Sequence, residues 1–222
     1  MRGEAMKYTT AIFDLDGTIT DSCPGILNAI RYALKKREID EPSEEVLRSF
    51  IGPPLQQQFQ TVFGLSEEEG AAMVSIYREY YGVKGIFENR VYDGVPEMLE
   101  KLRAAGVRVL MATSKPEKYA KRISEHFGFD RYFDFIGGAC MDGTRTDKHE
   151  VIEYVLSSCG ISEDERNSTV MIGDRSHDIL GAEKSGLHSI GVLYGYGSIE
   201  ELKEAGAEET ALHPSDITAI VV

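Results

Sequence analysis

The chain contains few cysteines, and their spacing suits neither a disulfide framework nor a zinc site. Cys23, Cys140 and Cys159 are odd in number, and no Cys-x-x-Cys pair occurs. Disulfide-rich secreted domains and zinc modules both need paired or clustered cysteines. We therefore expect three reduced cysteines that serve packing.

Long apolar runs and positive charge are also scarce. No apolar run approaches the roughly 18 residues that a membrane-spanning helix needs, and Met1 to Lys7 lacks the apolar centre of a signal peptide. The 24 lysines and arginines are outnumbered by 37 aspartates and glutamates, so the formal net charge is −13. This charge repels nucleic acids and anionic lipids, and a small anionic substrate would need local cations. We expect a soluble, cytoplasmic protein, a monomer or weak dimer, that binds neither nucleic acid nor a membrane.

The apolar content is sufficient for one sizeable domain with a modest insertion, because 42% of the 222 residues are hydrophobic. A buried strand is expected at residues 8–13, and helix and strand patterns alternate from residue 95 onward. Further strands are expected at residues 107–112, 133–136, 169–172 and 189–193, and helices at residues 95–105, 116–127, 147–158, 177–185 and 199–205. This alternation predicts an α/β fold whose core is a doubly wound, Rossmann-like parallel sheet.

Residues 21–90, between the first expected strand and the alternating helices and strands, carry helical patterns only. Helices are expected at residues 24–37, from Ser43 to the Gly52-Pro53-Pro54 break, from Pro54 onward, and at residues 66–82. Ser66 and Glu69 have the spacing of a capping box. We interpret residues 21–90 as an all-helical domain inserted into a core formed by residues 1–20 and 91–222.

Two acids follow the first strand, in the sequence Asp14-Leu15-Asp16-Gly17. Ligands of open α/β sheets bind outside the carboxyl ends of the strands, and a carboxylate can act as a nucleophile that becomes an aspartyl phosphate. An isolated Asp-x-Asp-Gly is more often a simple turn. A calcium-binding EF-hand loop is excluded, because Ile19 and Gly25 stand where that loop needs glycine and glutamate.

Three later sites fall at comparable positions in the predicted topology. Thr113 and Ser114 follow a strand and would open a helix, whose N-terminus suits a phosphate, although they also suit a simple cap. Lys148 begins a helix, where a cation is disfavoured unless an anion opposes it, although most lysines are solvated surface residues. Asp174 and Asp178 lie four residues apart and can hold a hard cation, or else cap their helix.

Together these motifs resemble the haloacid dehalogenase-like superfamily. The resemblance rests on Asp-Leu-Asp-Gly-Thr, Thr-Ser, an isolated lysine and Gly-Asp-x-x-x-Asp, and it spans nearly the whole chain, from Tyr8 to about Leu193. The segments Phe50-Ile-Gly-Pro-Pro-Leu55, Arg145-Thr-Asp-Lys148 and Gly173-Asp-Arg-Ser-His-Asp178 look like its phosphoglycolate phosphatase-like branch. The inserted helical domain then resembles the mobile cap of that branch.

The resemblance implies a role for each motif residue. Asp14 would attack phosphorus, and Asp16 would act as general acid and then as general base. Mg²⁺ would be held by Asp14, the Asp16 main-chain carbonyl and Asp174, with Asp178 in support. The phosphate-binding residues would be Thr113, Ser114 and Lys148.

These roles predict a magnesium-dependent phosphatase for a small phosphorylated metabolite. A phosphomutase, a 5'-nucleotidase or a pyrophosphatase of the same superfamily remain open alternatives, as does a noncatalytic phosphate-binding protein. A P-loop is absent, and Gly191, Gly195 and Gly197 are interpreted as loop glycines. In the inserted domain, Arg48, Gln56 and Gln57 are candidate specificity residues.

Overall fold

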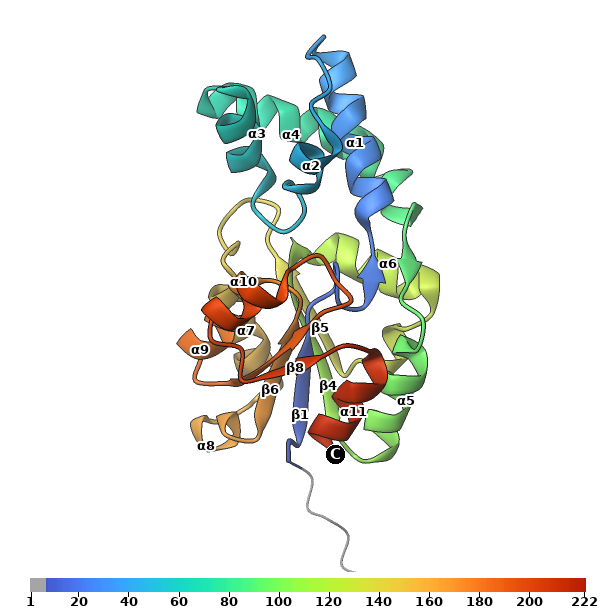
Figure 1. The fold of residues 1–222 in the computed structure, drawn as a ribbon, viewed down its shortest axis with the longest axis vertical. Coiled ribbons are helices and arrows are strands. Elements are labelled where there is room, and N and C mark those ends of the chain that lie inside the picture. The colour runs from blue at the N-terminus through green and yellow to red at the C-terminus, as the bar shows by residue number, and fades with distance from the viewer. Residues whose placement is uncertain (1–6) are drawn as a thin grey trace, which may run out of the picture. The chain divides into compact units, whose positions relative to one another are not determined.

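The computed structural model describes residues 7–222, which form two compact units (Figure 1). The first unit contains the described residues up to Thr20 together with Val91–Val222, and the second unit is Asp21–Arg90. Two short strands, β2 (Thr20–Asp21) and β3 (Arg90–Val91), pair where the chain passes between them. Each unit is described by itself below.

The first unit is built on a parallel sheet with six strands in its described part, in the order β5-β4-β1-β6-β7-β8. The strands are β1 (Thr10–Phe13), β4 (Arg108–Pro116), β5 (Phe135–Ala139), β6 (Thr169–Gly173), β7 (His188–Val192) and β8 (Glu209–Ala211). The helices are α5 (Val95–Ala104), α6 (Glu117–Phe127), α7 (Lys148–Cys159), α8 (Glu163–Arg166), α9 (Ser176–Lys184), α10 (Ile199–Glu204) and α11 (Pro214–Val221), with the 3₁₀ helix η2 (Asp130–Tyr132). The predicted α/β class is confirmed.

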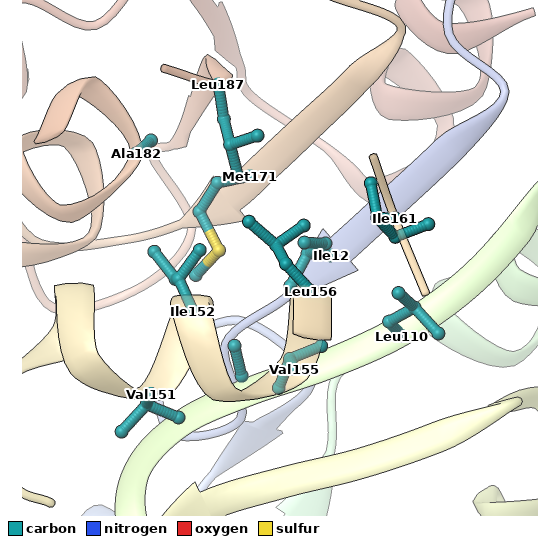
Figure 2. Packing of buried hydrophobic residues seen from close by; sticks show 11 residues of the cluster. Ile12, Leu110, Val151, Ile152, Val155, Leu156, Ile161, Met171, Ala182 and Leu187 are labelled. Carbon is teal, nitrogen blue, oxygen red and sulfur yellow. The ribbon is translucent and has the colours of Figure 1, made fainter. Parts of the chain in front are cut away.

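An apolar layer fills one face of this sheet, beneath α7 and α9. Ile12 of β1 pairs in register with Leu110 of β4 and Met171 of β6, so the three side chains share one face. Figure 2 shows them beside the apolar residues of α7, which are Val151, Ile152, Val155 and Leu156. On the other face, α5 and α6 pack against β4, and α11 packs against α5 (Figure 1). The sheet is therefore covered on both faces, as its continuous apolar strands require.

The second unit consists of helices around an aromatic core. Its elements are α1 (Cys23–Lys36), α2 (Glu44–Arg48), α3 (Leu55–Phe63), α4 (Glu67–Tyr81) and η1 (Gly85–Phe87). The ring centroids of Phe50 and Phe59 lie 5.0 Å apart, and both side chains are buried. The predicted capping box forms at the start of α4, where Ser66 and Glu69 exchange hydrogen bonds.

Several predicted boundaries differ from the structure. Helix α2 ends at Arg48 rather than at the Gly-Pro-Pro break, because Ser49 turns back to the Val46 carbonyl and the chain continues in tight turns. Strand β4 runs on to Pro116, so Thr113 and Ser114 lie in the strand and not at a helix start. Gly191 lies in β7, whereas Gly195 and Gly197 lie in the following loop as predicted. Among the described residues, no helix is long and apolar enough to cross a membrane.

Candidate active site

Strand β1 lies at the point where the chain order of the sheet reverses. The chain passes from β1 to β4 and β5 on one side, then returns to β6, which pairs with the other side of β1. The crevice at the carboxyl ends of such strands is the common ligand site of this architecture. Asp14 directly follows β1 and Asp174 directly follows β6, so the topology brings these two predicted acids together.

Three buried carboxylates meet at this edge. Each of Asp14, Asp174 and Asp178 offers an oxygen within 4.8 Å of those of the other two. The Lys148 ammonium lies 2.6 Å from Asp14 Oδ1 and 2.7 Å from Asp178 Oδ1, and donates to the Ala112 carbonyl at 3.0 Å. The side chain of Lys148 is only 2% exposed. The anion predicted opposite Lys148 is therefore present, and it is a pair of aspartates.

The local sequence explains why Lys148 reaches this position. Asp147 and Glu150 form a capping box that fixes the start of α7, so the helix begins at the lysine. The lysine stem passes closely over α9, where a Cβ on Gly181 would lie 2.7 Å from Lys148 Cγ. A larger residue at Gly181 would obstruct the lysine stem.

The charge of the cluster leaves room for a divalent cation. Three carboxylates face one ammonium, which gives a buried net charge of −2 if all the groups are ionised. Unbalanced buried charge is costly, and oxygen ligands of this kind suit Mg²⁺. The residues Asp14, Asp174 and Asp178 thus fit a magnesium ion in number, burial and ligand type.

The pKa values in the cluster reflect the same imbalance. Burial raises the pKa of Asp14 despite Lys148, and burial with Asp178 and Asp14 raises the pKa of Asp174 well above its usual range. Burial would also raise the pKa of Asp178, but Lys148 and His177 outweigh it and the pKa is lowered. Burial opposes the charged form of Lys148, yet the two aspartates raise its pKa. Of the three acids, Asp174 is the one that forms no ion pair with Lys148, so its negative charge is the least offset by nearby positive charge.

Asp16 forms a second, separate ion pair. Its Oδ2 atom lies 2.8 Å from the Lys115 ammonium, and its Oδ1 atom is buried without a hydrogen-bond partner among residues 7–222. A buried acceptor without a donor is free to accept a hydrogen bond from a bound ligand. Our sequence reasoning missed Lys115. The strand expected at residues 107–112 ended before Lys115, so the two-residue period of a strand was not extended to it.

The two predicted hydroxyl residues differ in their surroundings. The Thr113 side chain is buried within β4, and its Oγ1 atom accepts the Lys115 N–H at 3.2 Å. Ser114 is half-buried and joins none of the ion pairs described above. The expected helix N-terminus at these residues is wrong, because the register of β4 against β5 shifts after Thr113 and α6 begins only at Glu117.

The candidate specificity residues all lie in the second unit. The Arg48 side chain is 56% exposed and pairs with Glu44 at 3.4 Å. Gln56 donates to the Glu67 carbonyl at 3.3 Å, and Gln57 is exposed. Their contact with a substrate remains a prediction.

Comparisons with known proteins agree with this geometry. The family model described as haloacid dehalogenase-like hydrolase matches residues 11–192. The chain is 44% identical over 220 residues to a 5'-nucleotidase of Pseudomonas aeruginosa, which covers 99% of this chain and 97% of that protein. It is 40% identical over 186 residues to the tyrosine-protein kinase PtkA of Mycobacterium tuberculosis, covering 84% of this chain and 62% of that protein.

One further relative and one solved structure are also similar to this chain. A phosphoglycolate phosphatase of Vibrio parahaemolyticus is 29% identical over 218 residues, and the match covers 94% of each chain. The crystal structure of a predicted phosphatase from Clostridium acetobutylicum superposes with a TM-score of 0.90 at 42% identity, covering 96% of this chain and 97% of that one. The chain therefore belongs to the haloacid dehalogenase-like hydrolases, within their phosphoglycolate phosphatase-like branch, and is a phosphoric monoester hydrolase.

Proposed function

We propose that this enzyme hydrolyses small phosphate monoesters in a magnesium-dependent reaction that passes through an aspartyl phosphate on Asp14. The observation that carries the proposal is the buried cluster of Asp14, Lys148, Asp174 and Asp178 at the carboxyl edge of the sheet. A nucleophile, a fixed cation and two further acids converge there on one point.

Asp14 is the proposed nucleophile. Its Oδ1 atom accepts a hydrogen bond from Lys148, which orients the carboxylate and leaves Oδ2 to attack. Oδ2 forms a bond to phosphorus while the bond from phosphorus to the ester oxygen breaks. The lysine already donates to Asp14 and to the Ala112 carbonyl and forms an ion pair with Asp178, so its first effect is to hold Asp14 and supply positive charge.

Asp16 is the proposed proton carrier. Lys115 holds one of its oxygens, and the unpartnered Oδ1 atom is available to the substrate. Asp16 would protonate the departing ester oxygen and then take a proton from water. That water attacks phosphorus, the Asp14–phosphorus linkage breaks, and inorganic phosphate is released.

The proposed metal ligands are Asp14, Asp174 and the main-chain carbonyl of Asp16, with Asp178 in support. The three buried carboxylates around one ammonium support this assignment, because a bound cation would favour their ionised forms. When bound, Mg²⁺ would offset the charges of Asp14 and of the substrate phosphate and so allow them to approach. The Thr113 hydroxyl, buried within β4, would bind a phosphoryl oxygen.

Nucleoside 5'-monophosphates are the substrate class that we place first. The relative named 5'-nucleotidase matches almost the whole chain at 44% identity, whereas the phosphoglycolate phosphatase reaches 29%. The shared phosphoryl-transfer residues do not themselves select the leaving group. Phosphoglycolate is therefore the second substrate to test.

A phosphate-release assay tests the proposal. Purified enzyme is incubated with p-nitrophenyl phosphate, 5'-nucleotides, phosphoglycolate, pyrophosphate and hexose phosphates. We expect phosphate release with Mg²⁺, loss of release with a chelator, recovery when Mg²⁺ is restored, and poor replacement by Ca²⁺, whose coordination is looser. Full turnover after chelation would contradict the metal assignment. An isomerised sugar phosphate, or transfer of phosphate to protein tyrosine in place of release to water, would contradict the hydrolase assignment.

A further inference from the structure

The loop between β7 and α10, residues 193–198, lies directly against Asp174. Its sequence is Leu-Tyr-Gly-Tyr-Gly-Ser, and we call it the tyrosine-glycine loop. The Tyr196 main-chain N–H donates to Asp174 Oδ2 at 2.8 Å. Asp174 is fully buried, and this hydrogen bond gives one of its two oxygens a fixed main-chain donor.

The glycines of the loop permit this approach. A Cβ on Gly195 would lie 2.4 Å from both Asp174 Cβ and the Gly17 carbonyl oxygen, and a Cβ on Gly197 would lie 2.0 Å from the Asp174 carbonyl oxygen. Contacts this short do not occur between real atoms, so any side chain would push the loop and the acid apart. Across the site, a Cβ on Gly17 would lie 2.1 Å from Asp174 Oδ2. Asp174 is held between two segments that pass it closely.

A tyrosine joins these two segments. The Tyr194 hydroxyl donates to the Thr18 carbonyl at 3.0 Å, and the Thr18 hydroxyl donates to Asp174 Oδ1 at 3.4 Å. The 3.4 Å contact is long for a hydroxyl donor, so Oδ1 is only weakly engaged. Oδ2 is thus the positioned oxygen, and Oδ1 is the one left to a cation.

The helix after the loop fixes the segment on the other side of Asp174. Glu201 of α10 accepts the Ser176 main-chain N–H at 2.8 Å and the Arg175 side chain at 2.9 Å. The chain around Asp174 is therefore supported from residues about twenty positions later in the sequence, none of which belongs to the motifs that identify the family.

We propose that the tyrosine-glycine loop is a positioning clamp that sets the affinity of the site for Mg²⁺ by fixing the carboxylate of Asp174. The proposal rests on the proposed function, because it assumes that Asp174 is a metal ligand. Partners that orient a metal ligand without touching the metal commonly contribute about 10- to 100-fold to metal affinity.

Direct Mg²⁺ titration by calorimetry, without substrate, tests the clamp. Gly195→Ala should raise the Mg²⁺ dissociation constant at least about tenfold. The matched control is Gly128→Ala at the end of α6, where φ is +72° and no described atom would lie within 4 Å of the added Cβ. This control should lower the melting temperature but leave the dissociation constant unchanged. Equal weakening in both variants, or an unchanged dissociation constant in folded Gly195→Ala, would overturn the proposal.

If Gly195→Ala does not fold, Tyr194→Phe tests whether the loop sets the affinity for Mg²⁺. It removes only the hydroxyl that reaches Thr18, and the loss of one hydrogen bond should raise the dissociation constant about fivefold. An unchanged constant would overturn the clamp. If the wild-type enzyme releases phosphate while the clamp variants bind Mg²⁺ normally, the proposed function stands and the clamp fails. Absence of Mg²⁺ binding in the wild-type enzyme would contradict both.

Discussion

The carboxyl edge of the sheet and the apolar layer beneath α7 are both buried, yet they contain opposite kinds of side chain. At the edge, Asp14, Asp174 and Asp178 surround Lys148, the first residue of α7. The following turns of the same helix supply apolar residues such as Leu156 to the layer. Apolar burial stabilises the fold by about 25 cal/mol per Å², whereas buried ions cost several kcal/mol each before pairing. We infer that the layer maintains the fold and that the edge serves catalysis.

The largest expected effect comes from Asp14→Asn. An amide is a poor nucleophile and a poor magnesium ligand, so turnover should fall by at least about 10³-fold. Lys148 keeps its pair with Asp178, and one buried negative charge is removed. The melting temperature should therefore stay the same or rise. Asp164→Asn, at an exposed position of α8, is the control and should change neither quantity.

The reverse result is expected for Leu156→Ala in the apolar layer. Leu156 is 1% exposed, and a buried leucine truncated to alanine destabilises a protein by about 2–5 kcal/mol. Turnover per folded molecule should remain near the wild-type value at a temperature well below unfolding. Denaturant titration measures the stability, and Leu212→Ala is the control because Leu212 is 63% exposed. A large loss of turnover in folded Leu156→Ala would erase the distinction between the two regions.

Asp16→Asn should have a smaller effect on turnover than Asp14→Asn, about 10²-fold, because it removes proton transfer and not the nucleophile. The loss should be larger with an alkyl phosphate than with an aryl phosphate, whose leaving oxygen needs less protonation. Steady-state rates with both substrates measure this difference. Equal losses on the two leaving groups would remove Asp16 as the general acid.

Arg48→Ala has the smallest predicted effect and concerns the second unit. The Arg48 side chain is exposed, and its pair with Glu44 at 3.4 Å is a surface contact that contributes at most about 1 kcal/mol. If Arg48 pairs with a charged leaving group, its loss should raise the Michaelis constant about tenfold for a substrate whose leaving group is itself anionic, such as phosphoglycolate. Hydrolysis of p-nitrophenyl phosphate should be nearly unchanged. Arg37→Ala, at another exposed position of the same unit, should affect neither substrate.

The sheet and the acids were predictable because each leaves a local trace in the sequence. The apolar runs that precede Asp14 and Asp174 indicated strands, and the spacing of Ser66 and Glu69 indicated a capping box. Strand β8 escaped prediction, since a three-residue strand shows no period and its pairing with β7 is a tertiary contact. Helix α11 was also missed, although Pro214 in its first turn and the Asp216 side chain that accepts the His213 N–H are local signals of a helix start.

Within the site, the missed residues act across long sequence separations. Lys115 meets Asp16 after a chain separation of about one hundred residues, and Glu201 meets Ser176 across 25. A side chain at Gly195 would collide with Asp174, and the residues next to Gly195 in the sequence do not reveal this close approach. Strand β4 also continues past Thr113 to Pro116 through a register shift, which no period predicts.

The most direct test of the account is to trap the phosphorylated enzyme during turnover and identify the modified residue. Enzyme mixed with a phosphate monoester and Mg²⁺ is quenched in acid, and the acyl phosphate is reduced with borohydride before peptide mass spectrometry. We predict modification at Asp14, its absence in Asp14→Asn, and its slower disappearance in Asp16→Asn. Phosphate release without any modification of Asp14, or modification of a different residue, would contradict the assignment of the carboxyl edge as the catalytic centre.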